Sequence, residues 1–502
     1  MPAQINDTVF EQRLTELEKA NTWSPRVISK LETFIRSADD YDLFRINPFQ
    51  YGSARGMTDS EAIDLFIFAA KVGLFEMDWH LLCAYCPHVV GSFRELDKVH
   101  SHFQCPFCNA VNDVALDDYI QVTFTLSKQV RDNIFLRPEA LSVEDYYLRY
   151  HFAKGFKPPA GMTPQALIGM LSKLFVDIEP HQKRTFEFDL PVGRFEVMDL
   201  AHGLMLALFV KDQKSEAQTT QLQLNDGKFR VLNRETGPRD VVSGVARLAF
   251  RQAGDMPLGK HSLEIENCMD ERGRFWILQY PPAFEPAYVE YEPFLSGKKL
   301  LTTQTFRNLF RTQVINETEG IAVNDLTYLF TDLKGSTQLY DTVGDSNAYF
   351  LVRQHFDTLG KVVNARSGVI VKTIGDAIMA TFEKPQDGVA AAIEMIEEIT
   401  AFNKNISHEL HLKIGIHKGR SIAVTLNDRI DYFGQNVNIT SRIQALADAN
   451  EIYMSREVKE ASGITDILKA HHVTSDHVQV KGISEKLEVY RVTIKEGNAT
   501  TT

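Results

Sequence analysis

Two pairs of cysteines near residue 100 constrain this chain more than any other feature of its sequence. Four of the five cysteines form two CxxC pairs, at Cys83, Cys86, Cys105 and Cys108. Such pairs deliver four thiolates to one cation, and four sulfur ligands leave no open position. The spacing therefore predicts a structural Zn²⁺ site, not a disulfide framework. Because thiols persist in reducing compartments, we expect a cytoplasmic protein.

Other interpretations of the segment from Cys83 to Cys108, the cysteine window, stay open. His100 and His102 lie between the pairs and could replace a thiolate, and the thiolates could serve as a redox sensor. A zinc ribbon that binds nucleic acid is a further alternative. Only Arg94 and Lys98 are basic between the pairs, and the chain has a net charge of −12. We therefore expect no nucleic-acid partner, since phosphates require a basic face.

The pattern of apolar residues divides the 502 residues into several units. Helical periodicity, short alternating runs and then alternating strands and helices follow one another along the chain. The predicted fold is α+β and multidomain: a helical and zinc-ribbon region (1–160), a β-sandwich-like domain (161–295), a connector with a helix near 303–315 (296–324), an α/β sheet domain (325–496) and a disordered tail (497–502). No apolar run approaches the ~20 residues that cross a bilayer, so no transmembrane segment is predicted.

Three polar segments in the last large unit carry candidate chemistry. An apolar strand ends at Asp332 and runs into a Gly/Ser/Thr turn, where an acid can hold a hard cation and backbone N–H groups favour phosphate. Asp376 lies in the turn of a predicted hairpin. Asn438 and Arg442 share a face at i,i+4 if the segment is helical. Each feature alone is common in α/β proteins.

Together, these segments resemble the catalytic domain of the class III nucleotidyl cyclases, the adenylyl and guanylyl cyclases. The motifs occur in that family's order: FTDLKGST, KTIGDAIMATF, LKIGIHKG and DYFGQNVNITSRI. The resemblance implies that Asp332, Asp376 and the carbonyl of Leu333 ligate two Mg²⁺ or Mn²⁺ ions. These would ready the ribose 3′-hydroxyl for attack on the α-phosphorus and hold the triphosphate.

The resemblance also assigns roles to residues that would contact the nucleotide. Asn438 would orient the ribose, and Arg442 would bind the phosphoryl oxygens as charge develops on them. The remaining phosphate contacts would come from Lys334, Gly335, Ser336, Thr337 and Lys481.

The purine-reading positions of the family fall on Lys372 and Asp431. A lysine donates to N1 of adenine and an aspartate accepts from its 6-amino group, whereas guanine would mismatch both. The sequence thus predicts an adenylate cyclase that converts ATP to 3′,5′-cyclic AMP and pyrophosphate. A cyclase for GTP and a catalytically inactive cyclase-like scaffold or zinc-ribbon interaction protein are the alternatives.

The resemblance further implies a head-to-tail homodimer, because this chain carries one cyclase domain with both halves of a shared site. The first ~300 residues are similar to an uncharacterised module ahead of some bacterial cyclase domains, through Trp79 to Cys83 and Ile120 to Phe124. We expect this half to regulate the cyclase through the connector. Its ligand or partner is unknown.

Overall fold

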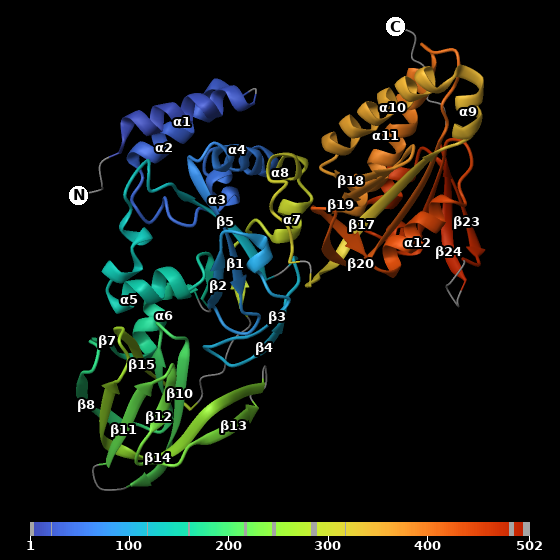
Figure 1. The fold of residues 1–502 in the computed structure, drawn as a ribbon. Coiled ribbons are helices and arrows are strands. Elements are labelled where there is room, and N and C mark those ends of the chain that lie inside the picture. The colour runs from blue at the N-terminus through green and yellow to red at the C-terminus, as the bar shows by residue number, and fades with distance from the viewer. Residues whose placement is uncertain are drawn as a thin grey trace.

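The computed structural model describes residues 5–21, 23–117, 119–158, 161–214, 218–242, 247–282, 289–316, 318–480 and 486–494. Figure 1 shows the cyclase-like unit beside an N-terminal half that itself divides into a helical part and a β-rich part. The predicted tail 497–502 lies outside the described residues.

Four helices form the N-terminal part: α1 (Asp7–Ala20), α2 (Pro25–Ser37), α3 (Pro48–Ser53) and α4 (Asp59–Lys71). Three of them match the predicted helical runs. A capping box begins α4, because Thr58 accepts from the backbone N–H of Glu61 while the Glu61 carboxylate accepts from that of Thr58. The helices pack on a three-stranded antiparallel sheet in the order β2-β1-β5, which comprises β1 (Phe75–Leu82), β2 (Val89–Phe93) and β5 (Ile120–Leu126).

The cysteine window folds between β1 and β5. Within this segment, a two-stranded sheet of β3 (His102–Gln104) and β4 (Val111–Asp113) flanks Cys105 and Cys108. Beyond β5 come the short helices α5 (Val143–Tyr146) and α6 (Pro164–Leu171), and β6 (Phe156–Lys157) pairs with β16 (Glu290–Tyr291).

The next unit is β-rich, as its alternating pattern predicts. Its nine strands are β7 (Ser172–Ile178), β8 (Lys183–Leu190), β9 (Gly193–Asp199), β10 (Leu204–Lys214), β11 (Gln218–Asn225), β12 (Lys228–Val231), β13 (Gly237–Val242), β14 (Arg247–Asn267) and β15 (Gly273–Tyr280). The long β14 joins both halves of the sheet, since it pairs with β10 and β13 along its first part and with β8 and β11 along its second. One apolar core includes side chains from both halves.

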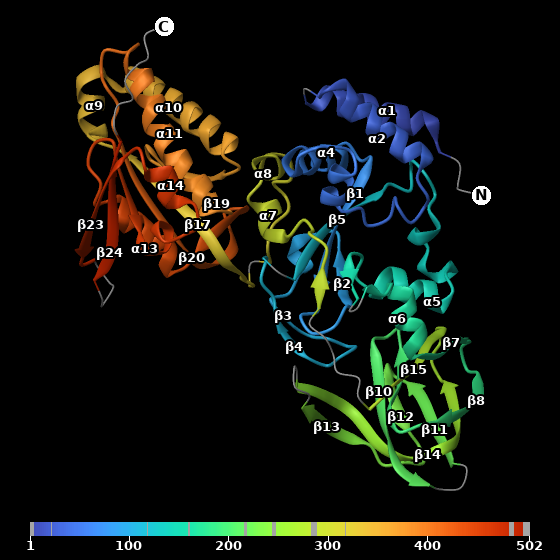
Figure 2. The same ribbon diagram turned by 180° about the vertical axis from the view of Figure 1, so that it is seen from behind.

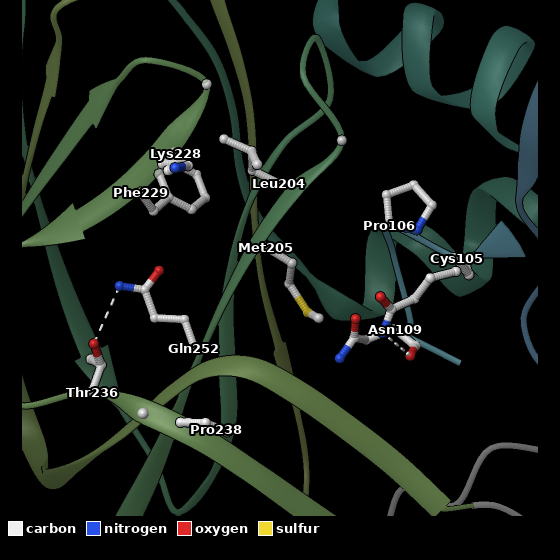
Figure 3. Close-up of a pocket in the computed structure, with 14 residues that line it drawn as sticks. Cys105, Pro106, Asn109, Leu204, Met205, Lys228, Phe229, Thr236, Pro238 and Gln252 are labelled. Carbon is white, nitrogen blue, oxygen red and sulfur yellow. Dashed lines mark hydrogen bonds between the residues drawn. The ribbon is translucent and has the colours of Figure 1, made fainter. Parts of the chain in front are cut away.

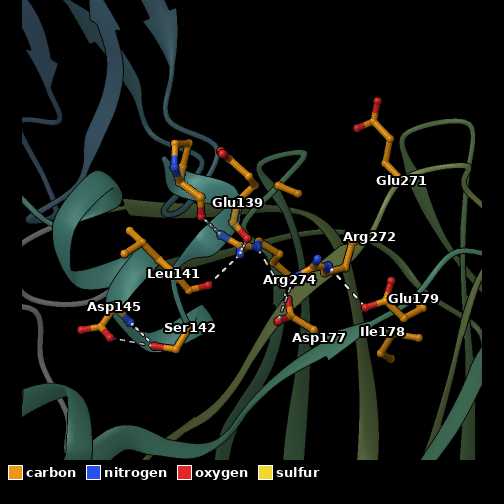
Figure 4. Close-up of polar contacts among 12 residues, drawn as sticks. Glu139, Leu141, Ser142, Asp145, Asp177, Ile178, Glu179, Glu271, Arg272 and Arg274 are labelled. Atoms are coloured by element: carbon orange, nitrogen blue, oxygen red, sulfur yellow. Dashed lines mark hydrogen bonds and ion pairs between the residues drawn. The ribbon is translucent and has the colours of Figure 1, made fainter. Parts of the chain in front are cut away.

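A buried arginine fixes the β-rich unit to the residues before α5 (Figure 4). Arg274 is 6% exposed and donates to the carbonyl oxygens of Pro138 and Leu141, both at 2.8 Å. Its Nε lies 3.6 Å from Asp177 on β7. Hydrogen bonds to several acceptors compensate a buried guanidinium for its lost hydration, so this contact holds the two parts in one arrangement.

The connector differs from the predicted single helix over 303–315. It contains two short helices, α7 (Gly297–Leu301) and α8 (Gln304–Leu309), and no regular element follows until β17 in the described part of this segment. Phe306 is buried in the N-terminal core, whereas Arg307 binds the cyclase-like unit. Neighbouring side chains of α8 thus contact two different units, and these tertiary contacts override the helical periodicity.

The C-terminal unit is an eight-stranded mixed sheet in the order β18-β19-β17-β20-β22-β24-β23, with β21 paired to β20. Helices α10 and α11 cover one face (Figures 1 and 2). The strands are β17 (Ile321–Leu333), β18 (Val369–Ile374), β19 (Ala377–Phe382), β20 (Leu412–Leu426), β21 (Arg429–Phe433), β22 (Glu451–Ser455), β23 (His472–Val478) and β24 (Leu487–Thr493). The helices are α9 (Ser336–Val343), α10 (Asp345–Ala365), α11 (Pro385–Asn403), α12 (Gln435–Gln444), α13 (Arg456–Lys459) and α14 (Ile464–Leu468).

The other face of this sheet shares an apolar core with the N-terminal helices. Phe66 and Trp79 belong to the same buried cluster as Phe306, Tyr328 and Met379. The two halves therefore meet through buried apolar surface, which favours a fixed relative position. Among the described residues, every helix is too short or too polar to span a bilayer.

Candidate functional site

The two predicted metal-binding acids lie at the ends of two paired strands: Asp332 is near the end of β17, and Asp376 comes directly before β19. Strand β17 pairs antiparallel with β19, and Phe330 faces Met379. The paired residues end at Phe330 and Met379, two residues before Asp332 and three residues after Asp376. The backbone N–H of Ile378 donates to Thr331 Oγ1 at 3.1 Å, so the strands stay joined up to this point. Both acids therefore lie at the same end of this antiparallel strand pair, within three residues of its last paired residues.

The surroundings of these acids suit a divalent cation. Oδ2 of Asp376 is buried and accepts no hydrogen bond from any described residue. Asp332 is 37% exposed, and its nearest cation is Lys413 Nζ at 3.6 Å. A buried carboxylate oxygen without a donor is costly unless a cation compensates it, and hard cations prefer carboxylate oxygen. The residues present therefore fit the predicted Mg²⁺ or Mn²⁺.

The turn after β17 leads directly into a helix. Gly335 has a φ of 72°, which favours glycine, and α9 begins at Ser336. Thr337 and the Lys334 side chain are exposed, and Lys334 Nζ lies 2.5 Å from Asp448. That hydrogen bond lowers the pKa of Asp448. In this structure Lys334 therefore pairs with a carboxylate, although it was predicted to contact phosphate.

The predicted purine-reading residues are in direct contact. Lys372 Nζ lies 2.5 Å from Asp431 Oδ2, and the backbone N–H of Tyr432 donates to Asp431 Oδ1 at 2.8 Å. The Asp431 side chain is 7% exposed and that of Lys372 is 38% exposed. A carboxylate has about four lone-pair positions, so Asp431 can accept a further hydrogen bond.

Helix α12 packs on the sheet through two glycines of β20. A Cβ at Gly415 would lie 2.3 Å from the backbone of Gln444, and one at Gly419 would lie 2.5 Å from Asn436. The buried face of α12 includes Val437 and Ile443, while Asn438 is exposed and Arg442 half-buried. Both predicted substrate-binding side chains thus lie outside the buried face. Lys481 lies outside the described residues.

Sequence reasoning missed a histidine that fixes the start of α12. His417 is 4% exposed, and its ring nitrogens contact Ser455 Oγ at 2.7 Å and Asn436 Oδ1 at 3.0 Å. Burial lowers the pKa of His417, so a neutral ring bridges β22 and α12. The signal was present in the GIHKG segment, where the histidine directly follows the apolar run IGI, which is buried together with it.

The four predicted zinc ligands converge on one point. Their Sγ atoms all lie within 4.8 Å of one another. Hydrogen bonds from the neighbouring thiols, that of Cys105 first, lower the pKa of Cys83, while burial raises that of Cys86. Four thiols this close cannot all ionise without a cation, and a divalent metal that binds thiolates removes the conflict.

A different histidine from the two predicted candidates contacts this cluster. His88 Nδ1 lies 3.1 Å from Cys86 Sγ, and its Nε2 lies 2.9 Å from Tyr147 Oη. His100 and His102 instead lie near Glu319 and Asp113, at 3.3 Å each. The sequence signal for His88 was its place two residues after a CxxC pair.

A cavity lies between the cysteine window and the β-rich unit (Figure 3). Its volume is about 630 Å³, and its walls include Pro106, Met205, Phe229 and Gln252. Gln252 donates to Thr236 Oγ1 at 3.2 Å. Lys228 is its one charged lining residue among those described, so the cavity offers little charge for a polar ligand.

Comparisons with known proteins divide the chain in two. Residues 10–308 match the "Family of unknown function (DUF5939)", and residues 320–494 match the "Adenylate and Guanylate cyclase catalytic domain". An adenylate cyclase of Anabaena cylindrica is 25% identical over 268 residues, which cover 49% of this chain and 52% of that protein. An adenylate cyclase of Mycosarcoma maydis is 30% identical over 168 residues, which cover 28% of this chain and 6% of that protein. The chain thus spans about half or less of these two relatives.

Solved structures also resemble the C-terminal unit. The adenylyl cyclase CyaB from P. aeruginosa is 24% identical, covers 36% of this chain and 97% of its own, and gives a TM-score of 0.31. The guanylyl cyclase Cya2 is 24% identical, covers 35% of this chain and 95% of its own, and gives a TM-score of 0.32.

Proposed function

Since this chain belongs to the DUF5939 family and carries a class III nucleotidyl cyclase domain, we propose that it is an adenylate cyclase. The substrate is ATP, and the products are 3′,5′-cyclic AMP and pyrophosphate. In this reaction the ribose 3′-oxygen forms a bond to the α-phosphorus, the bond from that phosphorus to the β-phosphate bridging oxygen breaks, and the 3′-hydroxyl proton leaves.

The observation that carries this proposal is the pairing of β17 with β19, which puts Asp332 and Asp376 at the same end of the strand pair. The unpartnered Oδ2 of Asp376 supports a cation there. Two Mg²⁺ or Mn²⁺ ions, when bound, would lower the pKa of the 3′-hydroxyl and neutralise the triphosphate. The two carboxylates and the carbonyl of Leu333 would hold them. The turn at Gly335 and Ser336, which leads into the start of α9, would offer backbone N–H groups to the phosphates.

The Lys372–Asp431 pair supports ATP over GTP. Lys372 would donate to adenine N1, and Asp431 would accept from the 6-amino group. Guanine presents N1–H and a 6-oxo oxygen, so Lys372 would face another hydrogen-bond donor and Asp431 another acceptor. Because Asp431 is nearly buried, water would screen its repulsion of the 6-oxo oxygen only weakly, and the mismatch would disfavour guanine.

We further propose that the site is completed by a second copy of the chain. Asn438 and Arg442 lie outside the buried face of α12, where they can act on a nucleotide held by a partner. Ile422 and Phe433 form a cross-strand pair close to α12 and are 46% and 49% exposed. An exposed apolar pair supports a protein interface at this edge.

The Cys83, Cys86, Cys105 and Cys108 cluster is proposed to bind a structural Zn²⁺. Four soft sulfur ligands select this metal over Mg²⁺. His88 would orient the Cys86 sulfur through its 3.1 Å contact. We also propose that the DUF5939 half regulates the cyclase domain and that the protein acts in the cytoplasm.

The proposed activity is tested by incubating the purified chain with ATP or GTP, with either Mg²⁺ or Mn²⁺, and separating the products by chromatography. We expect cyclic AMP from the native chain and almost none from Asp332→Asn or Asp376→Asn, which keep the side-chain shape and remove the charge. Asp325→Asn, which makes the same change at an exposed residue of the same strand, is a matched control that should retain activity. Turnover that survives both Asp→Asn changes would refute the proposal.

A further inference from the structure

The connector helix α8 forms a polar bond with the strand that carries Lys372. The backbone N–H of Ile370 on β18 donates to Gln304 Oε1 at 3.0 Å. Strand β18 is an edge strand of the sheet, so this N–H points away from β19 and has no strand partner there. Gln304 therefore fixes β18 two residues before Lys372.

The same helix forms a second bond with the strand that carries Asp431. Arg307 donates from Nη1 to the carbonyl oxygen of Ile430 at 2.9 Å and from Nη2 to Tyr432 Oη at 3.2 Å. Its Nε donates to the carbonyl oxygen of Leu301 at 2.9 Å, which fixes the guanidinium relative to the connector. Arg307 thus holds β21 on both sides of Asp431.

Packing alone does not set the position of these strands. A cavity of about 350 Å³ lies between α8 and the cyclase domain, and its walls include Gln304, Arg307, Lys372 and Ile430. Where a space is not filled by side chains, the hydrogen bonds across it determine how far apart its walls lie. Strands β18 and β21 are also held by their pairing with β19 and β20, so the two side chains of α8 add a constraint from outside the cyclase domain to the spacing of Lys372 and Asp431.

The opposite side of α8 is anchored in the DUF5939 half. Phe306 is 1% exposed, and its ring lies 6.0 Å from that of Trp79 on β1 in an edge-on arrangement. A shift of the N-terminal core would therefore move Phe306, and with it the neighbouring Arg307 and Gln304. This gives the N-terminal half a direct mechanical route to the purine end of the site.

We infer that Gln304 and Arg307 are positioning residues for purine selection, through which the N-terminal half adjusts the spacing of Lys372 and Asp431. The inference rests on the proposed function. A purine is read by two groups only if both reach its edge together, so loss of either bond weakens ATP binding and the preference for adenine more than the chemical step.

The test compares the full chain with Arg307→Ala and Gln304→Met, which remove the bonds, and with two matched controls. Arg311→Ala removes the same charge from an exposed residue of the same segment. Gln304→Glu keeps an acceptor for the Ile370 N–H. For each variant, kcat and KM are measured with ATP and with GTP, and circular dichroism reports the fold.

We expect Arg307→Ala and Gln304→Met to raise KM for ATP about tenfold and to lower the ATP:GTP ratio of kcat/KM about tenfold, with little change in kcat. Both controls should retain the native ratio. An unchanged ratio in the two variants, or an equal loss in Arg311→Ala, would overturn the inference. If Arg307→Ala does not fold, Gln304→Met decides alone. A native chain that converts neither nucleotide would refute the proposed function and this inference with it.

Discussion

The double variant Lys372→Glu, Asp431→Asn should convert the preference for ATP into one for GTP. The glutamate would accept from guanine N1–H, and the asparagine amide would donate to the 6-oxo oxygen. Asparagine keeps the shape of Asp431, which is 7% exposed, so the strand around it should hold its place. The two new side chains can also hydrogen-bond each other, as the native pair does.

The size of the effect follows from the burial of the two side chains. A hydrogen bond to a charged group contributes about 1.5–3 kcal/mol. Lys372 is 38% exposed, so we assign it the lower value of about 1.5 kcal/mol, and Asp431 is nearly buried, so we assign it about 3 kcal/mol. The sum of about 4.5 kcal/mol corresponds to a loss of about 10³-fold in kcat/KM for ATP relative to GTP.

The assay measures kcat/KM for both nucleotides at one metal concentration, with chromatography to identify each cyclic product. Each single variant should give a smaller shift in the ratio. If the folded double variant keeps an ATP:GTP ratio within about threefold of the native chain, these residues do not read the base.

Three further predictions concern stability and metal. Cys105→Ser, or chelation of the native chain, should remove one bound Zn²⁺ per chain, which mass spectrometry would detect. The melting temperature should then fall by several degrees, because the metal's binding energy supports the fold. An unchanged melting temperature after metal loss would argue against a structural role. Lys298 Nζ lies 2.5 Å from Asp117, and both side chains are largely buried (13% and 7% exposed). Asp117→Leu leaves the lysine charge unpaired, so it should lower the free energy of unfolding, measured with denaturant, by about 3–5 kcal/mol. The double variant with Lys298→Met should lose much less, and equal losses in the two variants would contradict this. Burial lowers the pKa of His261 to about 4, so the unfolded chain binds more protons than the folded chain below about pH 6.5. This histidine alone should therefore lower the free energy of unfolding by about 2 kcal/mol between pH 6.5 and pH 5. His261→Gln should flatten that dependence on pH, and an unaltered dependence would count against the prediction.

Much of the cyclase domain was predictable because its chemistry depends on local sequence. The strand before Asp332 and the hairpin around Asp376 follow from short apolar runs, and the structure contains both. The cysteine cluster followed from CxxC spacing alone. These features need only a few neighbouring residues to specify them.

Features that depend on distant partners were not predictable. The connector has helical periodicity, yet α8 ends at Leu309, where the backbone of Phe310 leaves helical geometry (φ −115°, ψ 50°). Lys334 pairs with Asp448, which lies more than 100 residues away along the chain. The positions of His88 and His417 in the sequence mark them as candidates, but their partners Tyr147 and Asn436 are set by the tertiary fold.

The central claim is that Asp332 and Asp376 of one chain act with Asn438 and Arg442 of another. The most direct test co-expresses Asp376→Ala and Arg442→Ala chains, each inactive alone, and measures cyclic AMP formation. Random pairing yields half heterodimers with one intact site each, so the account predicts recovery of about a quarter of native activity. Absence of any recovery in co-purified heterodimers would contradict it.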